Sequence, residues 1–450
     1  MSKQTTITVL GAGYVGLTTA AVLSHAGYKV YVVEPNKERL DIIKSGKSFF
    51  FEKGLDKIIR TALDAKDLIP TDSYEESVPF SSLVFSCVGT PDNPDGSSNL
   101  EFVFSAAEQT AKLALPKTIY IQKSTVPVGT GQKIEALFNE LGANLAYVSN
   151  PEFLRESTAI YDTLYFDRVV AGGNDKKAVN AVLDVYIELE KFREHIAHIA
   201  QIQTGARADQ YIATSLNSAE LIKVTSNAFL ALKISFANSI AILADKAGAD
   251  IVEVMDGVGA DNRIGRPFLN AGRGYGGGCF PKDVSGLIAS GLEYGVGLEI
   301  MRAAQQVNES MPGYIVDKLL ETMQTPLANK KIAVLGLAFK GGTSDVRKSP
   351  GIAIANELAK ASVQVATYDP EAGEEAAIDL DASIHQASTI EDALTDADAV
   401  MITTEWGEIL EYPAAEFARL MSGNVFVDAV NQYDPLAAKE AGLLYIGVGR

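Results

Sequence analysis

The chain has few of the residues on which disulfide scaffolds and metal centres depend. Its 450 residues include two cysteines and four histidines. Cys87 and Cys279 lie far apart, and two thiols do not make a disulfide-rich secreted protein, so we expect a reducing, cytoplasmic compartment. His195 and His198 could share a helix face, but no cluster of Cys, Asp or Glu ligands accompanies them. The sequence therefore predicts no metal site.

Positive charge and long uncharged apolar runs are also scarce. Lys and Arg number 39 against 57 Asp and Glu, which gives a net charge of −18. Such a surface repels nucleic acid and anionic lipid, so we expect neither as a partner. No basic segment precedes the first apolar run at Ile7, so we expect no signal peptide. The longest apolar helical stretch, residues 228–244, contains Lys233 and several polar residues, which favours a buried helix over a membrane span.

The length of the chain predicts two or three domains. In the first third, short apolar runs typical of strands alternate with helical patterns, which is the signature of parallel βαβ units. The predicted strands are residues 6–10, 29–34, 83–88, 118–123, 145–149 and 168–172.

The middle of the chain changes to helix, and the βαβ pattern then restarts. Residues 218–247 keep helical periodicity without a breaker, which predicts one long helix that could serve as a domain spine or a subunit interface. From residue 331 the alternation returns as a weak internal repeat of the first third. We therefore predict an α/β fold: two Rossmann-like doubly wound parallel-sheet domains, 1–205 and 326–450, joined by a central helical domain, 206–325.

The turn Gly11-Ala12-Gly13-Tyr14-Val15-Gly16 reads G-x-G-x-x-G between a predicted strand and a predicted helix. Glycines allow a tight turn and close approach of a pyrophosphate, and the helix N-terminus offers N–H donors. Glu34 lies at the end of the second predicted strand, where a carboxylate accepts a ribose 2′-hydroxyl and repels a 2′-phosphate. The sequence therefore predicts NAD rather than NADP; the alternative is a turn that only packs helix on strand.

The segment from Gly272 to Asp283 holds five glycines and ends in Cys-Phe-Pro-Lys-Asp. So many glycines suit a loop that lies against a ligand. Pro281 favours a helix start, which places Cys279 just before a helix N-terminus and near Lys282. Both features would lower the pKa of the thiol and make it nucleophilic, whereas an inert buried thiol is the alternative. Cys87, inside a predicted strand, is interpreted as core.

Four other segments carry polar groups whose role the residues alone leave open. Lys223 and Asn227 are four residues apart and share a helix face, where they could hold an alkoxide or a water, or could be a solvated pair. Glu152 and Glu156 follow a predicted strand, at the end of an α/β sheet that faces ligands, and a glutamate there could activate water. Residues 124–130 and 88–91 also follow strands and are either ligand loops or plain turns.

Taken together, these segments resemble the UDP-glucose/GDP-mannose dehydrogenase family over nearly the whole chain. The matching runs, in order, are GAGYVGL, VGTP, KSTVPVGT, NPEFLRES, ELIKVTSNAFLA, DNRIG, FLNAGRGYGGGCFPKD and GLAFKGGTSDVRKSP. The Phe-Leu-Asn-Ala-Gly and Cys-Phe-Pro-Lys-Asp runs are most similar to the UDP-glucose 6-dehydrogenase branch.

The resemblance implies oxidation of UDP-glucose to UDP-glucuronate by two molecules of NAD, through a thiohemiacetal and then a thioester on the Cys279 nucleophile. It also implies a homodimer that forms through the long central helix. Catalytic roles are implied for Cys279, Lys223, Asn227, Asp283, Glu152 and Thr125, with Lys223, Asn227 and Asp283 holding the reacting oxygen and a water. Cofactor contacts are implied for Gly11, Gly13, Tyr14, Val15, Gly16, Glu34, Arg39, Thr90, Thr125, Glu156 and Arg347. Substrate contacts are implied for Glu152, Phe153, Leu154, Lys223, Asn227, Arg263 (from the partner subunit), Phe268, Leu269, Asn270, Gly274, Tyr275, Gly276, Phe339 and Lys340.

Three departures from the family pattern leave substrate identity open. Val430 stands where an arginine is usual, Ser157 replaces a customary glycine, and residues 48–54 differ from the usual Pro-Ile-Tyr-Glu-Pro-Gly. The alternatives are the same chemistry on a UDP-N-acetyl-hexosamine or GDP-mannose, a one-step hydroxy-acid dehydrogenase, or a non-catalytic NAD-binding protein. The last would be expected to lack Cys279, Lys223 or Asp283, and all three are present.

Overall fold

The computed structural model of the chain describes residues 5–205, 210–323 and 330–450. The chain folds into two compact units, unit 1 (Met1–Ser226) and unit 2 (Asn227–Arg450). The predicted domain boundaries at residues 206 and 325 lie outside the described residues, so the three-domain division stays a prediction.

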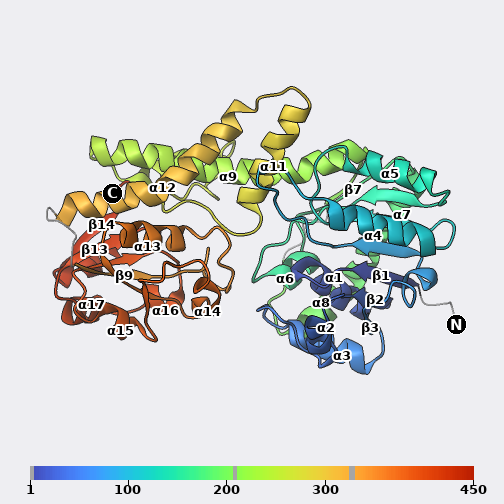
Figure 1. The fold of residues 1–450 in the computed structure, drawn as a ribbon, viewed down its shortest axis with the longest axis horizontal. Coiled ribbons are helices and arrows are strands. Elements are labelled where there is room, and N and C mark those ends of the chain that lie inside the picture. Colours follow the sequence, from blue (N-terminus) through green and yellow to red (C-terminus); the bar gives the residue numbers. More distant parts are fainter. Residues whose placement is uncertain (1–4, 206–209, 324–329) are drawn as a thin grey trace. The chain divides into compact units, whose positions relative to one another are not determined.

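Unit 1 is built on an eight-stranded sheet of order β3-β2-β1-β4-β5-β6-β7-β8 (Figure 1). Its strands are β1 (Thr6–Leu10), β2 (Lys29–Val33), β3 (Leu68–Thr71), β4 (Leu83–Ser86), β5 (Ile119–Gln122), β6 (Ala146–Ser149), β7 (Arg168–Gly172) and β8 (Gln210–Thr214). Neighbouring strands are parallel except β6 and β7, which form an antiparallel pair at Ser149 and Gly172. The prediction of parallel neighbours is therefore wrong at this one step. The chain reverses direction between β6 and β7, and antiparallel neighbours can be joined without a crossover connection.

Alternating residues of these strands build a core on each face of the sheet. Ile7 and Val9 pack with α1, α3, α7 and α8, whereas Leu10 and Val84 point to the other face and pack with α4 and α5. The helices of unit 1 are α1 (Tyr14–His25), α2 (Lys37–Lys44), α3 (Leu55–Asp64), α4 (Glu101–Leu113), α5 (Thr130–Glu140), α6 (Ala159–Leu164), α7 (Lys176–Leu189) and α8 (Arg193–Ala200), with 3₁₀ turns at Val78–Phe80 and Glu190–Phe192.

Unit 2 repeats the same strand order in a six-stranded parallel sheet, β11-β10-β9-β12-β13-β14. Its strands are β9 (Lys331–Leu335), β10 (Gln364–Tyr368), β11 (His385–Gln386), β12 (Ala399–Ile402), β13 (Val425–Asp428) and β14 (Leu444–Gly447). Numbered within each sheet, the six strands of unit 2 and the first six of unit 1 both read 3-2-1-4-5-6, the doubly wound Rossmann arrangement. The predicted fold class and internal repeat are thus confirmed.

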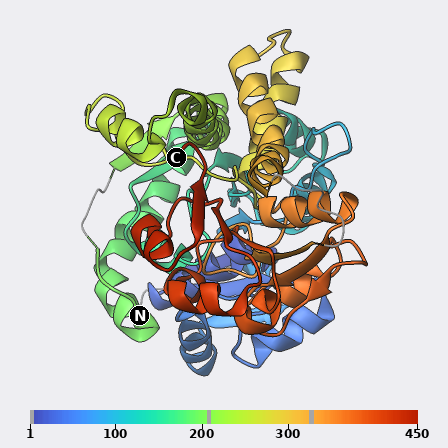
Figure 2. The same ribbon diagram turned by 90° about the vertical axis from the view of Figure 1, so that its left-hand side faces the viewer.

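Helices cover both faces of the second sheet as well (Figures 1 and 2). Ile332 and Val334 pack with α12 and α13, and Ala333 and Leu335 pack with α15 and α17 on the opposite face. The helices of unit 2 are α10 (Ile251–Gly259), α11 (Phe280–Glu293), α12 (Glu299–Met323), α13 (Pro350–Lys360), α14 (Gly373–Ala376), α15 (Ile390–Leu394), α16 (Gly407–Leu410), α17 (Ala414–Leu420) and α18 (Pro435–Glu440).

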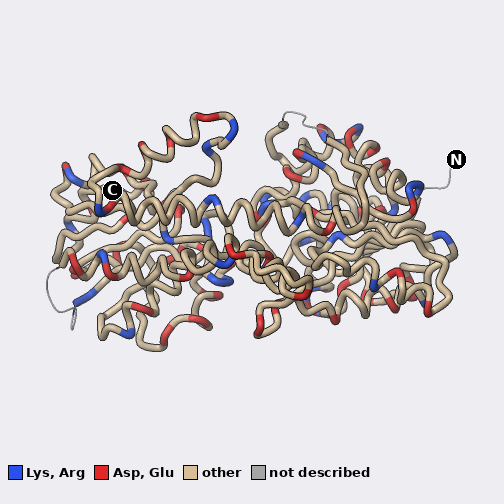
Figure 3. The backbone as a smooth tube through the Cα atoms, turned by 90° about the horizontal axis from the view of Figure 1, so that it is seen from above, with Lys and Arg blue, Asp and Glu red and all other residues tan. Residues whose placement is uncertain are grey.

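The predicted long helix is confirmed as α9 (Leu216–Ala247), which carries the chain from unit 1 into unit 2. Within the described ranges it is the one helix that passes a length and hydropathy test for a membrane span, and its most apolar window is 44% buried. A core helix of a soluble protein passes the same test, so this is weak evidence for a membrane. Acidic and basic residues are intermixed over both units (Figure 3), and the acidic residues are more numerous, 57 against 39.

In each sheet the strand order reverses beside the first strand, between β1 and β4 and between β9 and β12. Loops that leave the carboxyl ends of such a pair diverge and open a crevice, which is where doubly wound sheets bind ligands. In unit 1 these loops begin at Gly11 and Cys87, and in unit 2 at Gly336 and Thr403. The two switch points are therefore the places to examine for sites.

Candidate active site

The glycine turn after β1 has the geometry that a dinucleotide needs. Gly11 has a φ of +86°, and a Cβ there would lie 2.9 Å from the Cys87 carbonyl oxygen, so only glycine fits. A Cβ on Gly16 would collide with the Gly11 carbonyl, which fixes α1 close to β1. Gly13 is the N-cap of α1, and a Cβ there would meet no atom within 4 Å. The open space lies at a helix N-terminus, where a pyrophosphate binds, so these residues fit the dinucleotide.

The residues expected to hold the ribose lie beside this turn. Glu34 follows β2 directly and is buried, and its carboxylate accepts the Ala12 N–H at 3.3 Å and the Asn36 N–H at 2.9 Å. Arg39 is exposed in the first turn of α2. Its guanidinium stacks over the Phe49 ring at 4.8 Å. A carboxylate held at the end of β2 favours a free 2′-hydroxyl.

The other two strand-end loops of unit 1 are tied together. Ser124 Oγ donates to the Val88 carbonyl at 2.6 Å, which joins the loop after β5 to the loop after β4. Thr125 and Thr90, in these two loops, are both partly exposed. Both threonines thus lie at the carboxyl ends of the central strands, on the ligand side of the sheet.

Tyr14 joins the turn to a buried carboxylate and to the loop that contains Glu156. Its hydroxyl donates to Glu52 and accepts the Ser157 N–H. Burial and the hydrogen bond to Glu52 raise the pKa of the Tyr14 hydroxyl, so it stays protonated. Glu52 also accepts the Ile160 N–H at 3.2 Å, and burial raises its pKa. The altered segment 48–54 therefore still contributes a carboxylate to this turn.

Ser157 has a φ of +74°, which explains why a glycine is customary at this position. A serine in the left-handed region strains the folded protein by about 1 kcal/mol. A glycine removes this strain, but it also makes the unfolded chain more flexible, which cancels part of the gain in stability. We expect Ser157→Gly to raise the free energy of unfolding by about 0.5 kcal/mol, measured by urea denaturation. Ser105→Gly, inside α4, is the matched control and should lower it by a similar amount. A loss of stability in Ser157→Gly would contradict this explanation.

Glu152 and Lys223 form a buried ion pair in unit 1. The Lys223 ammonium lies 3.0 Å from Glu152 Oε1, and both side chains are at least nine-tenths buried. Burial alone would raise the pKa of Glu152, but the Lys223 ammonium and the Leu154 N–H outweigh it and hold that pKa below its usual value. The Phe153 ring lies 5.4 Å from the Lys223 ammonium. Glu152 is therefore a carboxylate, able to accept a proton.

A second buried polar group centres on Asp283 in unit 2. Asn227 Nδ2 donates to one Asp283 oxygen at 2.6 Å, and the Lys282 ammonium contacts the other at 2.7 Å. Asp283 lies in the first turn of α11, and the N-cap of that helix is Cys279, as predicted. The Cys279 side chain is exposed. An exposed thiol at a helix N-terminus, one turn from a buried carboxylate–amide pair, is positioned to act as a nucleophile.

The loop before Cys279 is confined by its neighbours at consecutive glycines. A Cβ on Gly276 would collide with the Lys348 carbonyl, one on Gly277 would lie 2.8 Å from the Phe339 ring, and one on Gly278 would meet the Arg347 guanidinium. Asn308 on α12 binds both the N–H and the carbonyl of Tyr275, at 2.7 and 3.0 Å. These contacts fix the path of the chain at Tyr275, Gly276 and Gly277, and the Arg347 guanidinium lies beside Gly278, the residue before Cys279.

The other residues implied to bind substrate lie in three places within unit 2. Phe339 and Lys340 follow β9 at the second switch point, with Phe339 against the glycine loop. Arg263, 89% exposed, pairs with Asp261 at 2.6 Å. The remaining residues belong to the segment before Cys279: Phe268 (φ +66°), Leu269, Asn270 and Gly274 (φ +95°). Leu269 is buried in the core, and its backbone N–H and carbonyl already bind Arg266, at 3.1 and 2.9 Å, so the structure does not show how it would contact a ligand.

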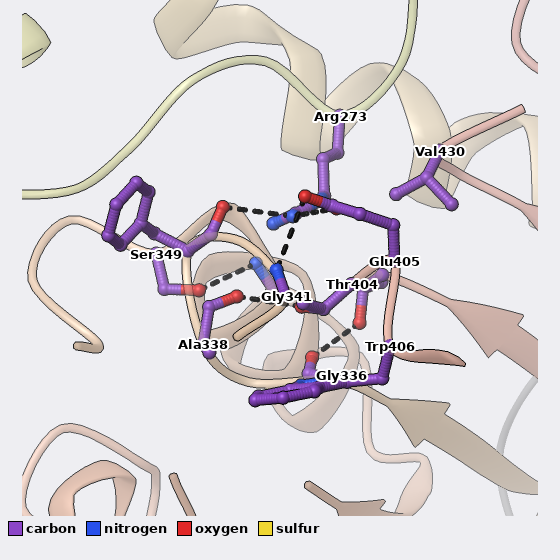
Figure 4. Close-up of polar contacts among 12 residues, drawn as sticks. Arg273, Gly336, Ala338, Gly341, Ser349, Thr404, Glu405, Trp406 and Val430 are labelled. Carbon is purple, nitrogen blue, oxygen red and sulfur yellow. Dashed lines mark hydrogen bonds and ion pairs between the residues drawn. The ribbon is translucent and has the colours of Figure 1, made fainter. Parts of the chain in front are cut away.

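Arg273 lies within residues 268–275, for which the resemblance implies substrate contacts, but the sequence assigns it no role of its own; the structure buries it at the second switch point (Figure 4). Its Nη2 donates to the Phe339 carbonyl at 2.9 Å and to Glu405 at 3.1 Å. An arginine between two glycines was the available signal, but its partners lie 66 and 132 residues away. Cys87 is the opposite case, as predicted: burial raises the pKa of its thiol to about 12.

The predicted cofactor residues of unit 1 thus lie at the carboxyl ends of its strands, whereas in unit 2 the segment that ends in Cys279 is contacted by Phe339 and Arg347, and Asp283 follows one turn later with its partner Asn227. Lys223 and Asn227 connect the two sets in sequence, since they lie on adjacent turns of α9. In the part of the chain that the structure describes, no group of three or more His, Cys, Asp or Glu could hold a metal ion.

Family profiles cover most of the chain. The NAD binding domain of the UDP-glucose/GDP-mannose dehydrogenase family matches residues 5–190, its central domain 217–310, and its UDP binding domain 333–435. The second switch point falls within the last of these. The first and last matches contain the two sheets, apart from the edge strands β8 and β14, and the central match begins in α9 and includes Cys279.

Relatives match over their full length. The chain is 40% identical to the UDP-glucose 6-dehydrogenase YwqF of Bacillus subtilis, over 99% of this chain and 97% of the relative. It is 37% identical to the UDP-glucose 6-dehydrogenase of Rhizobium meliloti, over 99% of both chains. A UDP-glucose dehydrogenase structure from Pyrobaculum islandicum superposes with a TM-score of 0.88 at 34% identity, over 100% and 98% of the two chains. A UDP-D-ManNAc dehydrogenase structure from Pyrococcus horikoshii superposes with a TM-score of 0.85 at 26% identity, over 99% of both. The chain therefore belongs to the UDP-glucose/GDP-mannose dehydrogenase family and is an NAD-dependent dehydrogenase.

Proposed function

We propose that this chain oxidises the primary alcohol of UDP-glucose to the carboxylate of UDP-glucuronate, in two oxidations linked by a covalent bond to Cys279. The observation that carries the proposal is the exposed Cys279 thiol at the N-cap of α11, one turn from the buried Asn227–Asp283 pair. A one-step alcohol dehydrogenase needs no such thiol, whereas an alcohol-to-acid oxidation must retain the reactive aldehyde. The names of the relatives support UDP-glucose as the substrate.

The first half of the reaction makes and captures an aldehyde. NAD, when bound at the Gly11–Gly16 turn, supplies the hydride acceptor for each of the two oxidations. Lys223 and Asn227 hold the alcohol oxygen, and a water held with Asp283 takes its proton as the C–H bond breaks. Cys279 Sγ then adds to the aldehyde carbon, and the carbonyl oxygen takes a proton to give a thiohemiacetal.

The second half oxidises the adduct and releases it. Loss of a second hydride and of the hydroxyl proton turns the thiohemiacetal into a thioester. Glu152, ionised beside Lys223, takes a proton from a water that Thr125 helps to order, and that water attacks the thioester carbon. The C–S bond breaks, Cys279 recovers its proton, and the acid leaves. Overall, one alcohol and one water give one carboxylate, two hydrides and three protons.

The proposal is tested by the ratio of NADH formed to sugar consumed. The purified protein is given NAD with UDP-glucose, and the product is identified by mass spectrometry. We expect two NADH for each UDP-glucose, with UDP-glucuronate as the product. One NADH per sugar, or no turnover of any nucleotide sugar, contradicts the proposal.

A second candidate is the same chemistry on another nucleotide sugar, either a UDP-N-acetyl-hexosamine or GDP-mannose. It is favoured by Val430 in place of an arginine and by the similarity to a UDP-D-ManNAc dehydrogenase. A panel of these sugars in the same assay separates the candidates, since the true substrate has the highest kcat/KM.

We further propose a homodimer that forms through α9, in the cytoplasm. Leu221, Phe229, Phe236 and Leu243 recur every seven or eight residues along this helix, and each is 43–61% exposed. This spacing aligns the four side chains in one apolar stripe along the helix. Soluble monomers rarely expose such a continuous apolar surface to solvent. Lys233 on the same helix contacts the Gly265 carbonyl at 2.9 Å and so holds the loop with the exposed Arg263 beside α9. That position supports a role for Arg263 in the partner's site.

Phe236→Asp is expected to break the dimer. A charge in the middle of the stripe removes an aromatic anchor, and we expect self-association to weaken at least about thirtyfold. Light scattering after gel filtration should show the mass fall from twice 48.0 kDa to 48.0 kDa. Phe102→Asp on α4, where the side chain is 55% exposed against 49% for Phe236, is the matched control and should leave the mass unchanged. A Phe236→Asp protein that keeps the wild-type mass contradicts this interface.

A further inference from the structure

Arg273 is the one residue of the glycine loop whose long side chain is buried at the carboxyl end of the second sheet. Its side chain is 5% exposed, and its N–H donates to the Ala429 carbonyl at 2.8 Å, directly before Val430. Figure 4 shows the guanidinium between the loop after β9 and the loop after β12. These two loops flank the point where the strand order reverses, which is where a doubly wound sheet binds its ligand.

The guanidinium holds the loop after β9 through two partners. It donates directly to the Phe339 carbonyl, and it pairs with Glu405, which in turn accepts the Gly341 N–H at 3.2 Å. Both ends of the segment 339–341 are therefore attached to one charged group. The rest of the loop is held independently, because Thr404 Oγ donates to the Ala338 carbonyl at 2.7 Å.

The positive charge of Arg273 is balanced by the negative charge of Glu405. The Glu405 carboxylate is 31% exposed, and Arg273 is the positive partner that faces it. Nη1 of Arg273 is buried without a hydrogen-bond partner among the described residues. A buried donor without a partner is costly, and where one persists it calls for a functional reason. Val430, an aliphatic residue 9% exposed, supplies no charge here.

We propose that Arg273 is a positioning and specificity-determining residue for the nucleotide diphosphate of the substrate: it cancels the charge of Glu405 and holds the loop 339–341 for the ligand. This rests on the proposed function, because it takes unit 2 to bind a nucleotide sugar. Without Arg273 an unpaired carboxylate would face an anionic ligand, whereas without Glu405 the guanidinium would be left free to attract it. The two partners of one ion pair therefore have opposite effects on affinity for the diphosphate.

The experiment measures binding of UDP to the full-length protein by titration calorimetry. Arg273→Met, similar in volume, should weaken UDP binding at least about tenfold and raise KM for UDP-glucose by a similar factor, with kcat and KM for NAD unchanged. Glu405→Gln should bind UDP as tightly as the wild type or more tightly. Both effects should shrink at high salt, as electrostatic effects do. Arg419→Ala, which removes an exposed ion pair on α17, is the matched control.

The outcomes separate electrostatics from simple structural support. If the ion pair only stabilises the fold, both variants weaken UDP binding together, and that result overturns the proposal. Unchanged UDP affinity in Arg273→Met also overturns it. If Arg273→Met does not fold, Glu405→Gln decides alone: weaker UDP binding overturns the proposal and equal or tighter binding supports it. A wild-type protein that binds no UDP contradicts the proposed function together with this inference.

Discussion

Replacing Cys279 with serine is expected to abolish formation of the acid while dinucleotide binding stays intact. Serine keeps the size of the side chain, but its hydroxyl is a far weaker nucleophile, so the aldehyde is not captured. We expect kcat for acid formation to fall at least about a thousandfold. The Gly11–Gly16 turn belongs to unit 1 and Cys279 to unit 2, so the affinity for NADH, measured by its fluorescence, should not change. Unimpaired acid production would rule out the covalent mechanism.

Alkylation of the two thiols provides the control for this prediction. Cys279 is exposed, whereas burial raises the pKa of Cys87 to about 12. Iodoacetamide should therefore modify one cysteine in the native wild-type protein and none in Cys279→Ser, as counted by mass spectrometry. Modification of Cys87 in the native protein would contradict the contrast between the two thiols.

Lys223→Met is expected to damage both activity and stability. It removes the ammonium that the proposed mechanism places on the reacting oxygen, so we expect kcat to fall at least about a hundredfold. It also leaves Glu152 buried without its partner, which costs about 3–5 kcal/mol of unfolding free energy. Steady-state kinetics and chemical denaturation measure the two effects separately.

The pair Lys223→Met with Glu152→Gln distinguishes these effects. Removing both charges should restore most of the stability but none of the activity. The pKa of Glu152 is lowered in the folded protein, so the stability that the pair contributes is present above pH 4.5, the usual value, and is lost as the pH falls through the folded pKa. The double variant should lack this loss at acid pH. A single variant as stable as the wild type at neutral pH would contradict the assignment.

The central strands were predictable because they are short apolar runs in a regular βαβ rhythm. Strands at the sheet edges were missed, for reasons visible in their residues. β3 contains Pro70, which cannot donate to a ladder and is tolerated only at an edge, and β8 has no fully buried residue. The antiparallel step between β6 and β7 was also missed, since an apolar run predicts a strand but not its direction.

Some features of the candidate site depend on residues close in sequence, and others depend on residues far apart in sequence. The glycine turn before α1 and the position of Cys279 before α11 are set by residues a few positions away, so the sequence alone predicted both. The partners of buried charges are not set by nearby residues. Lys223 pairs with Glu152, 71 residues away, and Arg273 pairs with Glu405, 132 residues away. Such pairs depend on strand order, and no spacing in the sequence predicts them.

The confined glycines before Cys279 have an evolutionary consequence. At Gly276 a side chain would strike the Lys348 backbone, and at Gly277 it would strike the Phe339 ring from a left-handed backbone, so these two positions accept little but glycine. Changes in the recognition of the nucleotide must then enter at the few adjacent positions that already bear side chains. Position 273 is one of these, and its backbone contacts the loop with Val430. If unit 2 binds the nucleotide as proposed, a substitution at position 273 changes the charge at the second switch point while Gly276 and Gly277 keep the path of the chain to Cys279.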